Sequence, residues 1–97
     1  MLAQVFALGP VPAGADASLG PAAEAAIKET RQAAGCEGLL VLTSREGGEG
    51  LAIVLWRDDA SLEAMSRRQA EHLDEIRADR PSLPHVPPAE LFDVITA

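Results

Sequence analysis

EGLLVLT (residues 37–43), SREGGEG (44–50) and LAIVLW (51–56) follow one another and decide the fold of this chain. The two outer segments are short apolar runs of the length and composition that favour β-strands over helices. The connector between them holds three glycines, which allow the positive φ angles of a hairpin loop. The stretch therefore predicts an antiparallel β-hairpin.

A helix is predicted on each side of this hairpin. Residues 21–34 (PAAEAAIKETRQAA) are strong helix formers, with Pro21 suited to the first turn and Gly35 to the C-cap. After the hairpin, Asp58-Asp59 supplies an N-cap and an acidic first turn for a helix over residues 60–78. Its stripe has steps of three and four and is mainly apolar: Leu62, Met65, Gln69, Leu73 and Ile76.

The two ends of the chain supply the outer strands. Residues 3–8 (AQVFAL) form a short apolar run that Gly9-Pro10 is expected to stop, and residues 89–97 (AELFDVITA) favour a last strand after a proline-rich linker. The order strand, helix, strand, strand, helix, strand predicts an α+β fold. We expect a ferredoxin-like βαββαβ domain over residues 1–97, with two helices on one face of a four-stranded antiparallel sheet.

The hairpin strands predict a partner for the chain. LLVL and LAIVL are continuous apolar runs rather than alternations of apolar and polar residues, which is typical of strands covered on both faces. The two helices can cover only one face of the sheet. A second copy of the sheet is the simplest cover for the other, so we predict a homodimer formed through the sheet face.

Composition excludes several classes of function. The 97 residues carry 15 acidic and 8 basic side chains, a net charge of −7, and no basic stripe that could follow a phosphate backbone. Nucleic-acid binding is therefore not expected. No apolar run reaches the length of a membrane span, and the apolar N-terminus lacks the basic start of a signal peptide. We expect a cytoplasmic protein, and the single cysteine, Cys36, as a small packing residue.

The segments GCEGLLVL, LAIVLWRDDASLEAM and ELFDVITA resemble the dimeric α/β-barrel superfamily, and most closely its antibiotic-biosynthesis-monooxygenase-like domains. The shared features are a glycine after the first helix, an apolar second strand, and an aromatic and an acidic residue where the third strand enters the second helix. That corner here reads Leu55-Trp56-Arg57-Asp58. The resemblance covers nearly the whole chain.

The resemblance implies a dimeric α/β barrel with a pocket between sheet and helices in each protomer. Some members oxidise polycyclic aromatic molecules with dioxygen and without metal or flavin, so no cofactor is expected. Others degrade haem and rely on an asparagine of the first strand, a tryptophan and a histidine of the second helix. This sequence has no asparagine, and Gln4 is the only amide of its first strand. Haem degradation is therefore not expected.

Four residues are candidates for a ligand pocket: Trp56, Met65, Gln69 and His72. His72 is the candidate general base, and the alternative is a histidine at the helix border that bonds a carboxylate or water. Trp56 would stack on a planar ligand, or it simply packs at the strand end with a partner for its indole N–H. Met65 fits the core equally well. Gln69 would orient a ligand, or its amide reaches solvent.

Two functions remain open at this stage. The first is a cofactor-independent, monooxygenase-like protein that acts on or binds a small hydrophobic or aromatic molecule by positioning and proton abstraction. The second is a non-catalytic dimeric module that binds a small molecule or serves in stress. No metal site is predicted, because His72 and His85 lack partners at ligand spacing and only one cysteine is present.

Overall fold

The computed structural model describes residues 1–11, 20–46, 48–80 and 86–97. The predicted loop and linker lie in part outside these ranges, as does His85. The elements follow in the order β1 (Leu2–Val11), α1 (Pro21–Gln32), β2 (Cys36–Thr43), β3 (Gly48–Trp56), α2 (Asp59–Asp79) and β4 (Glu90–Asp93).

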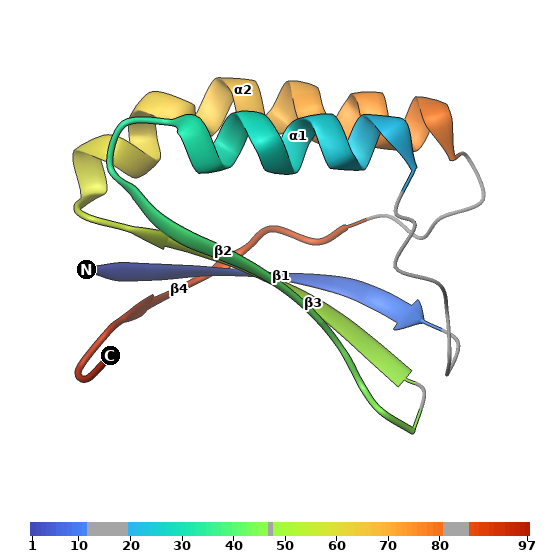
Figure 1. Ribbon diagram of the computed structural model, residues 1–97, viewed down its shortest axis with the longest axis horizontal. Helices are drawn as coiled ribbons and strands as arrows, with labels where there is room; N and C mark the ends of the chain where they lie inside the picture. Colours follow the sequence, from blue (N-terminus) through green and yellow to red (C-terminus); the bar gives the residue numbers. More distant parts are fainter. Residues whose placement is uncertain (12–19, 47, 81–85) are drawn as a thin grey trace.

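Within the described residues, the strands form one antiparallel sheet in the spatial order β2-β3-β1-β4, and both helices lie over the same face (Figure 1). This is the ferredoxin-like βαββαβ arrangement, so the predicted fold class is confirmed. Strands β2 and β3 form the expected hairpin. Strands β1 and β4, from opposite ends of the chain, pair beside it.

Strand β1 continues through Gly9 and Pro10, where the sequence predicted that it would stop. Gly9 has a φ of 80°, and the register with β3 shifts between Ala7 and Gly9, which marks a β-bulge. Strand β4 pairs with β1 only as far as Val5. Beyond that point β1 has no second strand partner among the described residues, and an edge segment of this kind tolerates a proline.

Strand β4 ends at Asp93, so the prediction of a strand over residues 89–97 was wrong for its second half. Asp93 pairs with Leu2, the first residue of β1, and the N–H of Val94 donates to the Met1 carbonyl at 3.0 Å. The β-branched residues after Asp93 favour a strand by propensity. However, β1 offers no further residue to pair with them, and a strand needs a neighbour.

The two helices begin and end close to their predicted positions. Helix α1 begins at Pro21 and ends at Gln32, because the backbone of Ala33 is already extended. Helix α2 has Asp58 as its N-cap, whose carboxylate accepts the Ser61 hydroxyl at 2.6 Å and the Ser61 backbone N–H at 2.8 Å. These bonds, the hydroxyl first, hold the pKa of Asp58 below its ordinary value of 3.8.

Helix α2 is amphipathic as predicted. Its apolar stripe residues are all half-buried, and Leu62 and Met65 pack directly against the core. Charged side chains occupy most of the other face. Neither described helix has an apolar stretch long enough to cross a membrane.

The turn between α1 and β2 passes very close to the start of α2. Gly35 has a φ of 82°, and a Cβ at this position would overlap the side chain of Ser61. The Gly35 carbonyl also accepts the backbone N–H of Arg57 at 2.7 Å. Glycine is required here both by the backbone conformation and by the lack of space.

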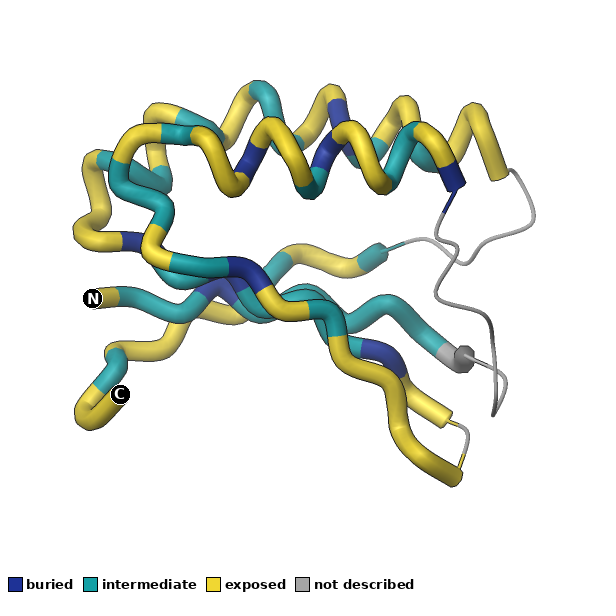
Figure 2. Tube along the Cα trace, viewed as in Figure 1, coloured by how far each residue is buried: buried dark blue, intermediate teal, exposed yellow. Residues whose placement is uncertain are grey.

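The core lies between the helices and one face of the sheet, which we call the covered face (Figure 2). Its centre is formed by Leu39, Val54 and the fully buried Trp56. Partly buried residues from both helices and the other strands pack around this centre: Leu2, Phe6, Ile27, Ala33, Cys36, Val41, Leu62 and Met65. Cys36 is thus a packing residue, as expected.

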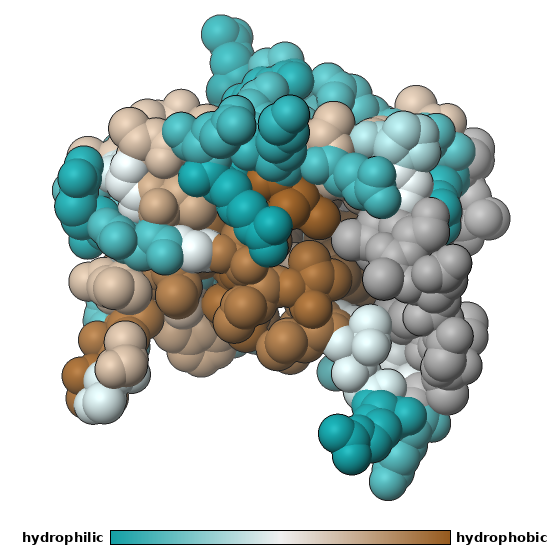
Figure 3. All heavy atoms as spheres, viewed as in Figure 1, coloured by the Kyte–Doolittle hydropathy of each residue, from teal (hydrophilic) through white to brown (hydrophobic). Residues whose placement is uncertain are grey.

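The opposite face of the sheet, which we call the open face, is also apolar. Side chains alternate between the two faces of a strand, so Leu40 and Leu42 of β2 lie opposite Leu39. They are 52% and 44% exposed. In register beside Leu40 are Ile53 and Val5, both only partly buried. Figure 3 shows apolar side chains gathered along the sheet layer, below helices that are largely hydrophilic.

Strand β2 is an edge strand in the described part of the chain. The N–H of Ser44 donates to Glu49 on β3 at 3.3 Å, and the alternation of an antiparallel ladder turns the backbone groups of Leu39 towards the edge. The Leu39 carbonyl accepts a hydrogen bond from Nη2 of Arg31, on α1, at 3.1 Å. One polar group of the edge is therefore already occupied.

Candidate functional site

Three polar side chains meet within the apolar layer between the sheet and α2. Gln4 of β1 and Trp56 of β3 point from the covered face, and Gln69 of α2 reaches down to them. Gln4 Oε1 accepts the Trp56 indole N–H at 2.9 Å and Gln69 Nε2 at 2.7 Å. In return, Gln4 Nε2 donates to Gln69 Oε1 at 3.0 Å. We call these three residues the amide cluster.

The tryptophan fixes the orientation of both amides. An indole N–H can only donate, so Gln4 must turn its oxygen towards Trp56. Its nitrogen then faces the oxygen of Gln69, and the two carboxamides pair reciprocally. Gln4 is 6% exposed and Trp56 is fully buried, so an unpaired donor or acceptor would be costly at this position.

Met65 lies one helical turn before Gln69 on the same stripe of α2. Its side chain is half-buried and contacts the core around Trp56. Trp56, Met65 and Gln69 therefore come together at the interface of sheet and helix. The partner that the sequence analysis expected for a buried indole is Gln4, and the Gln69 amide turns inward to the same partner.

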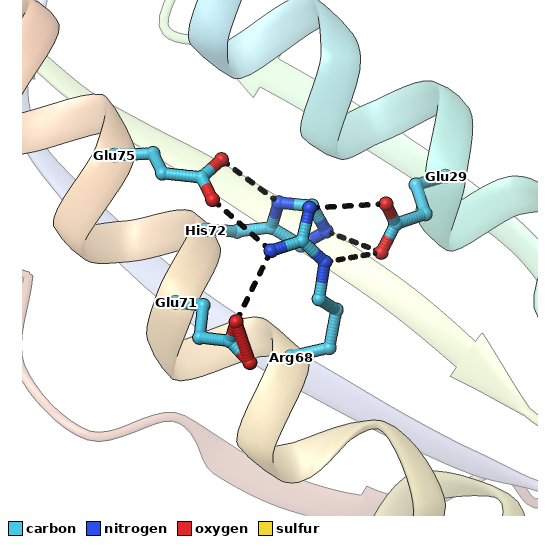
Figure 4. A network of polar contacts seen from close by, with 5 residues as sticks. All are labelled: Glu29, Arg68, Glu71, His72 and Glu75. Atoms are coloured by element: carbon cyan, nitrogen blue, oxygen red, sulfur yellow. Dashed lines mark hydrogen bonds and ion pairs between the residues drawn. The ribbon is translucent and has the colours of Figure 1, made fainter.

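The fourth candidate, His72, lies one turn further along α2 in a separate cluster. Its ring is 4% exposed and sits between the helices, with Nε2 at 3.0 Å from Glu29 Oε2 on α1 (Figure 4). Its Nδ1 has no hydrogen-bond partner among the residues described and lies 3.8 Å from Glu75 Oε2. This is the histidine paired with a carboxylate that the sequence analysis gave as the alternative to a general base.

Arg68 is the centre of the cluster around His72, which we call the helix clamp. Its guanidinium binds Glu29 through two nitrogens, at 2.7 and 3.1 Å, and also contacts Glu75 at 3.0 Å and Glu71 at 3.4 Å. The hydrogen bond from Arg68 is the main reason that the pKa of Glu29 lies below its ordinary value. The bonds to Glu29 and Glu75 raise the pKa of Arg68 further, so it stays charged.

The two clusters differ in what chemistry they allow. The amide cluster offers donors, acceptors and an aromatic face in apolar surroundings, which suits recognition of a small molecule. The helix clamp contains the titratable groups, and these are engaged with one another across the two helices. No group of His, Cys, Asp and Glu side chains in the described ranges is arranged to hold a metal ion.

Two solved structures resemble the fold of this chain. The first is the structure of Rv0793 from Mycobacterium tuberculosis, with a TM-score of 0.68 and 23% sequence identity over 99% of this chain and 96% of that one. The second is from Deinococcus radiodurans and is described as a "putative antibiotic biosynthesis monooxygenase". Its TM-score is 0.61, with 18% identity over 100% of this chain and 95% of that one. This chain has their fold.

The likeness to these two proteins is one of fold. No protein-family model and no curated protein sequence matches the chain. The ferredoxin-like fold is thus shared over nearly the full length of both proteins, whereas the dimeric barrel that the resemblance implies stays a prediction. Activity and ligand must be argued from the residues of this chain.

Sequence reasoning missed three residues of these clusters: Gln4, Glu29 and Arg68. Gln4 carried a signal, because it is the one polar residue inside the apolar run AQVFAL and alternation places it on the same face as Phe6. Glu29 and Arg68 carried no such signal in the sequence. Both belong to helix faces rich in charge, and only the packing of α1 beside α2 brings them together.

Proposed function

We propose that this protein is a monooxygenase-like protein that binds, and acts on, a small hydrophobic or aromatic molecule between the sheet and the helices. The observation that carries this proposal is the amide cluster. A carboxamide pair and a tryptophan lie in a layer otherwise lined by apolar side chains of the sheet and the helices. Such a site has an apolar wall for a ring and a few polar groups to orient it.

In this proposal Trp56 and Met65 contact the ring, and Gln69 exchanges its bond with Gln4 for a bond to the ligand. The ligand then competes with Gln4 for the Gln69 amide. It must therefore carry at least one polar group that can replace the hydrogen bond from Gln4. His72 is the histidine near the site in the described part of the chain and remains the candidate base. Oxidation of a phenol by dioxygen to a quinone and water is balanced without an external reductant, so it suits a protein that works without a cofactor.

A non-catalytic module is the second candidate, and the helix clamp favours it. His72 bonds Glu29 across the helices, so its Nε2 is not free to take a proton from a ligand. The polar atoms of the amide cluster likewise bond one another. A protein with this arrangement needs no catalytic step to be useful as a dimeric carrier or binding domain.

We further propose that the protein is a homodimer that buries the open faces of two sheets against each other. Leu40 and Leu42 on the edge strand β2, together with Phe92 of β4 on the other edge at 50% exposure, support this assembly. A contiguous apolar surface of this kind on a protein with a net charge of −7 is more typical of an interface than of a solvent-facing sheet. Light scattering should give about twice the chain mass of 10.2 kDa.

The test of function uses Trp56, because it is the only tryptophan and the chain has no tyrosine. We would titrate the protein with 1-naphthol while recording Trp56 fluorescence, and in parallel measure dioxygen uptake and 1,4-naphthoquinone formation. The Gln69→Ala variant should change the affinity. The Arg67→Ala variant, on the exposed side of α2, should not.

Quenching together with dioxygen uptake would support the enzyme, and uptake should then fall in a His72→Gln variant. Quenching without uptake would support the non-catalytic module. Fluorescence that no naphthol concentration alters would contradict both, because a ring cannot enter the layer beside Trp56 unnoticed.

A further inference from the structure

Residues 94–97 extend beyond β4 and leave an apolar side chain in solvent. Ile95 is 97% exposed, more than any other large hydrophobic residue among those described. The segment begins with a hydrogen bond from Val94 N–H to the Met1 carbonyl at 3.0 Å, which holds its first residue beside the start of β1. Figure 1 shows it projecting from the side of the sheet that faces away from the helices.

A groove lies at the other end of the same side, where the hairpin of β2 and β3 closes. It holds about 500 Å³ and is lined by Leu42, Thr43, Ser44, Gly48, Glu49 and Leu51. Leu42 and Leu51 are paired in register, and alternation places both on the open face. The groove thus has an apolar floor that continues the open face out to the hairpin tip.

The segment and the groove cannot meet within one chain. In Figures 1 and 2 the C-terminal residues and the hairpin tip project on the same side of the sheet but from opposite ends of the molecule. A two-fold dimer makes its contacts twice, with each copy giving to its partner what it receives. Two open faces packed in opposite directions bring the C-terminal segment of each copy to the hairpin of the other.

We infer that the occupant of the groove is the C-terminal segment of a second copy of this chain, with Ile95 resting on Leu42 and Leu51. The inference rests on the proposed homodimer and adds to it how the two copies are oriented. It accounts for an isoleucine that has no role in the fold of its own chain. It also gives the hairpin tip a neighbour that the flat part of the open face does not supply.

The first test measures dimer dissociation by analytical ultracentrifugation. Ile95→Ser removes one buried side chain from each half of the dimer, so the dissociation constant should rise at least about a hundredfold. Folding should be unaffected, because Ile95 contacts little within its own chain. Thr96→Ser is the matched control and should leave the dissociation constant within about twofold.

The second test fixes the orientation. In a Cys36→Ala background, protein carrying Ile95→Cys is mixed with protein carrying Ser44→Cys and oxidised at low concentration. A disulfide between the two kinds of chain should form faster than between Ile95→Cys and Arg67→Cys, which lies on the helix side. Both tests must succeed for the inference to stand.

The outcomes separate the inference from the proposal beneath it. A wild-type protein that stays monomeric overturns the homodimer and the inference with it. A wild-type dimer that Ile95→Ser does not weaken overturns the inference alone. Preferential linking of Ile95→Cys to itself also overturns the inference, because the two segments would then meet each other rather than the hairpins.

Discussion

The two faces of the sheet carry similar side chains and have different surroundings. Leu39 and Leu40 are neighbours in β2, yet Leu39 is buried under the helices and Leu40 is half exposed. Hydrophobicity therefore does not distinguish the faces. The covered face includes Gln4, whose polar atoms are paired inside the protein. On the open face Leu40, Ile53 and Val5 lie in one row, and a polar side chain, Glu90, follows only at the β4 edge. One face recognises its own helices, and the other is suited to a flat apolar partner.

The largest effect should come from exchanging these two leucines for alanine. Leu39→Ala should lower the free energy of unfolding by about 2–5 kcal/mol, as for other buried leucines. Leu40→Ala should cost about 1 kcal/mol or less in protein dilute enough to be monomeric, because half of its side chain already meets solvent. Urea unfolding at two protein concentrations measures both. If the two variants lost the same free energy of unfolding in dilute protein, the two faces of the sheet would not differ in burial as described.

Two glycines extend the comparison to the backbone. Gly35→Ala should destabilise the protein by more than about 2 kcal/mol, since a left-handed residue with a side chain costs about 1–2 kcal/mol and the methyl group also overlaps Ser61. Gly38→Ala is the matched control in β2. A Cβ there meets only Leu55 Cδ1 at 3.7 Å, an ordinary contact. Thermal unfolding of both variants should show a clear loss for the first and little for the second.

The polar anchor of the covered face can be removed by Gln4→Leu. The change leaves the Trp56 N–H and the Gln69 amide without a partner, so stability should fall by about 1–3 kcal/mol. The same substitution in a Trp56→Phe background should cost less, because the indole donor is already gone. A double-mutant cycle measured by urea unfolding gives the coupling. Strict additivity of the two changes would mean that the Gln4–Trp56 bond contributes nothing to stability.

The smallest effect concerns the helix clamp and appears only as a dependence on pH. The pKa of Glu29 is lowered in the folded protein, so its pairing adds stability above the ordinary value of 4.5 and loses it as pH falls through the folded-state pKa. Glu29→Gln should therefore lower the melting temperature at pH 6 slightly, and the difference should shrink towards pH 3. Ion pairs that are partly exposed to solvent contribute little to stability, so we expect the melting temperature to shift by a few degrees at most. A difference that grows in acid would contradict the assignment.

The sequence predicted the fold well because each element carried its own local signal. Glycines in the hairpin, Pro21 at a helix start and the stripe of α2 all act over a few residues. The errors came at strand ends, whose positions depend on which residues of the neighbouring strand are available for pairing. Strand β4 stops at Asp93, which pairs with Leu2, the first residue of β1, and β1 passes Pro10 where β4 no longer pairs with it. Neither limit is visible in local composition.

The sequence identified the candidate residues one by one, but it did not predict the contacts between them. Trp56, Met65 and Gln69 were expected near one another, but the bond that organises them comes from Gln4, 52 positions from Trp56 and 65 from Gln69. His72 was expected beside a carboxylate or water, and the carboxylate that it contacts most closely is Glu29 on the other helix. Their roles in binding or catalysis stay predictions.

The hydrogen bond from Arg31 to the Leu39 carbonyl bears on how the protein avoids aggregation. An exposed edge strand of eight residues, with no lysine or proline, is a template onto which other chains can add in the manner of amyloid. The guanidinium occupies one acceptor of that template and places a charge beside it. Growth by strand addition is thereby discouraged, while stacking of sheet faces stays possible. In the homodimer that we propose, this arginine would help self-association to stop at a closed pair.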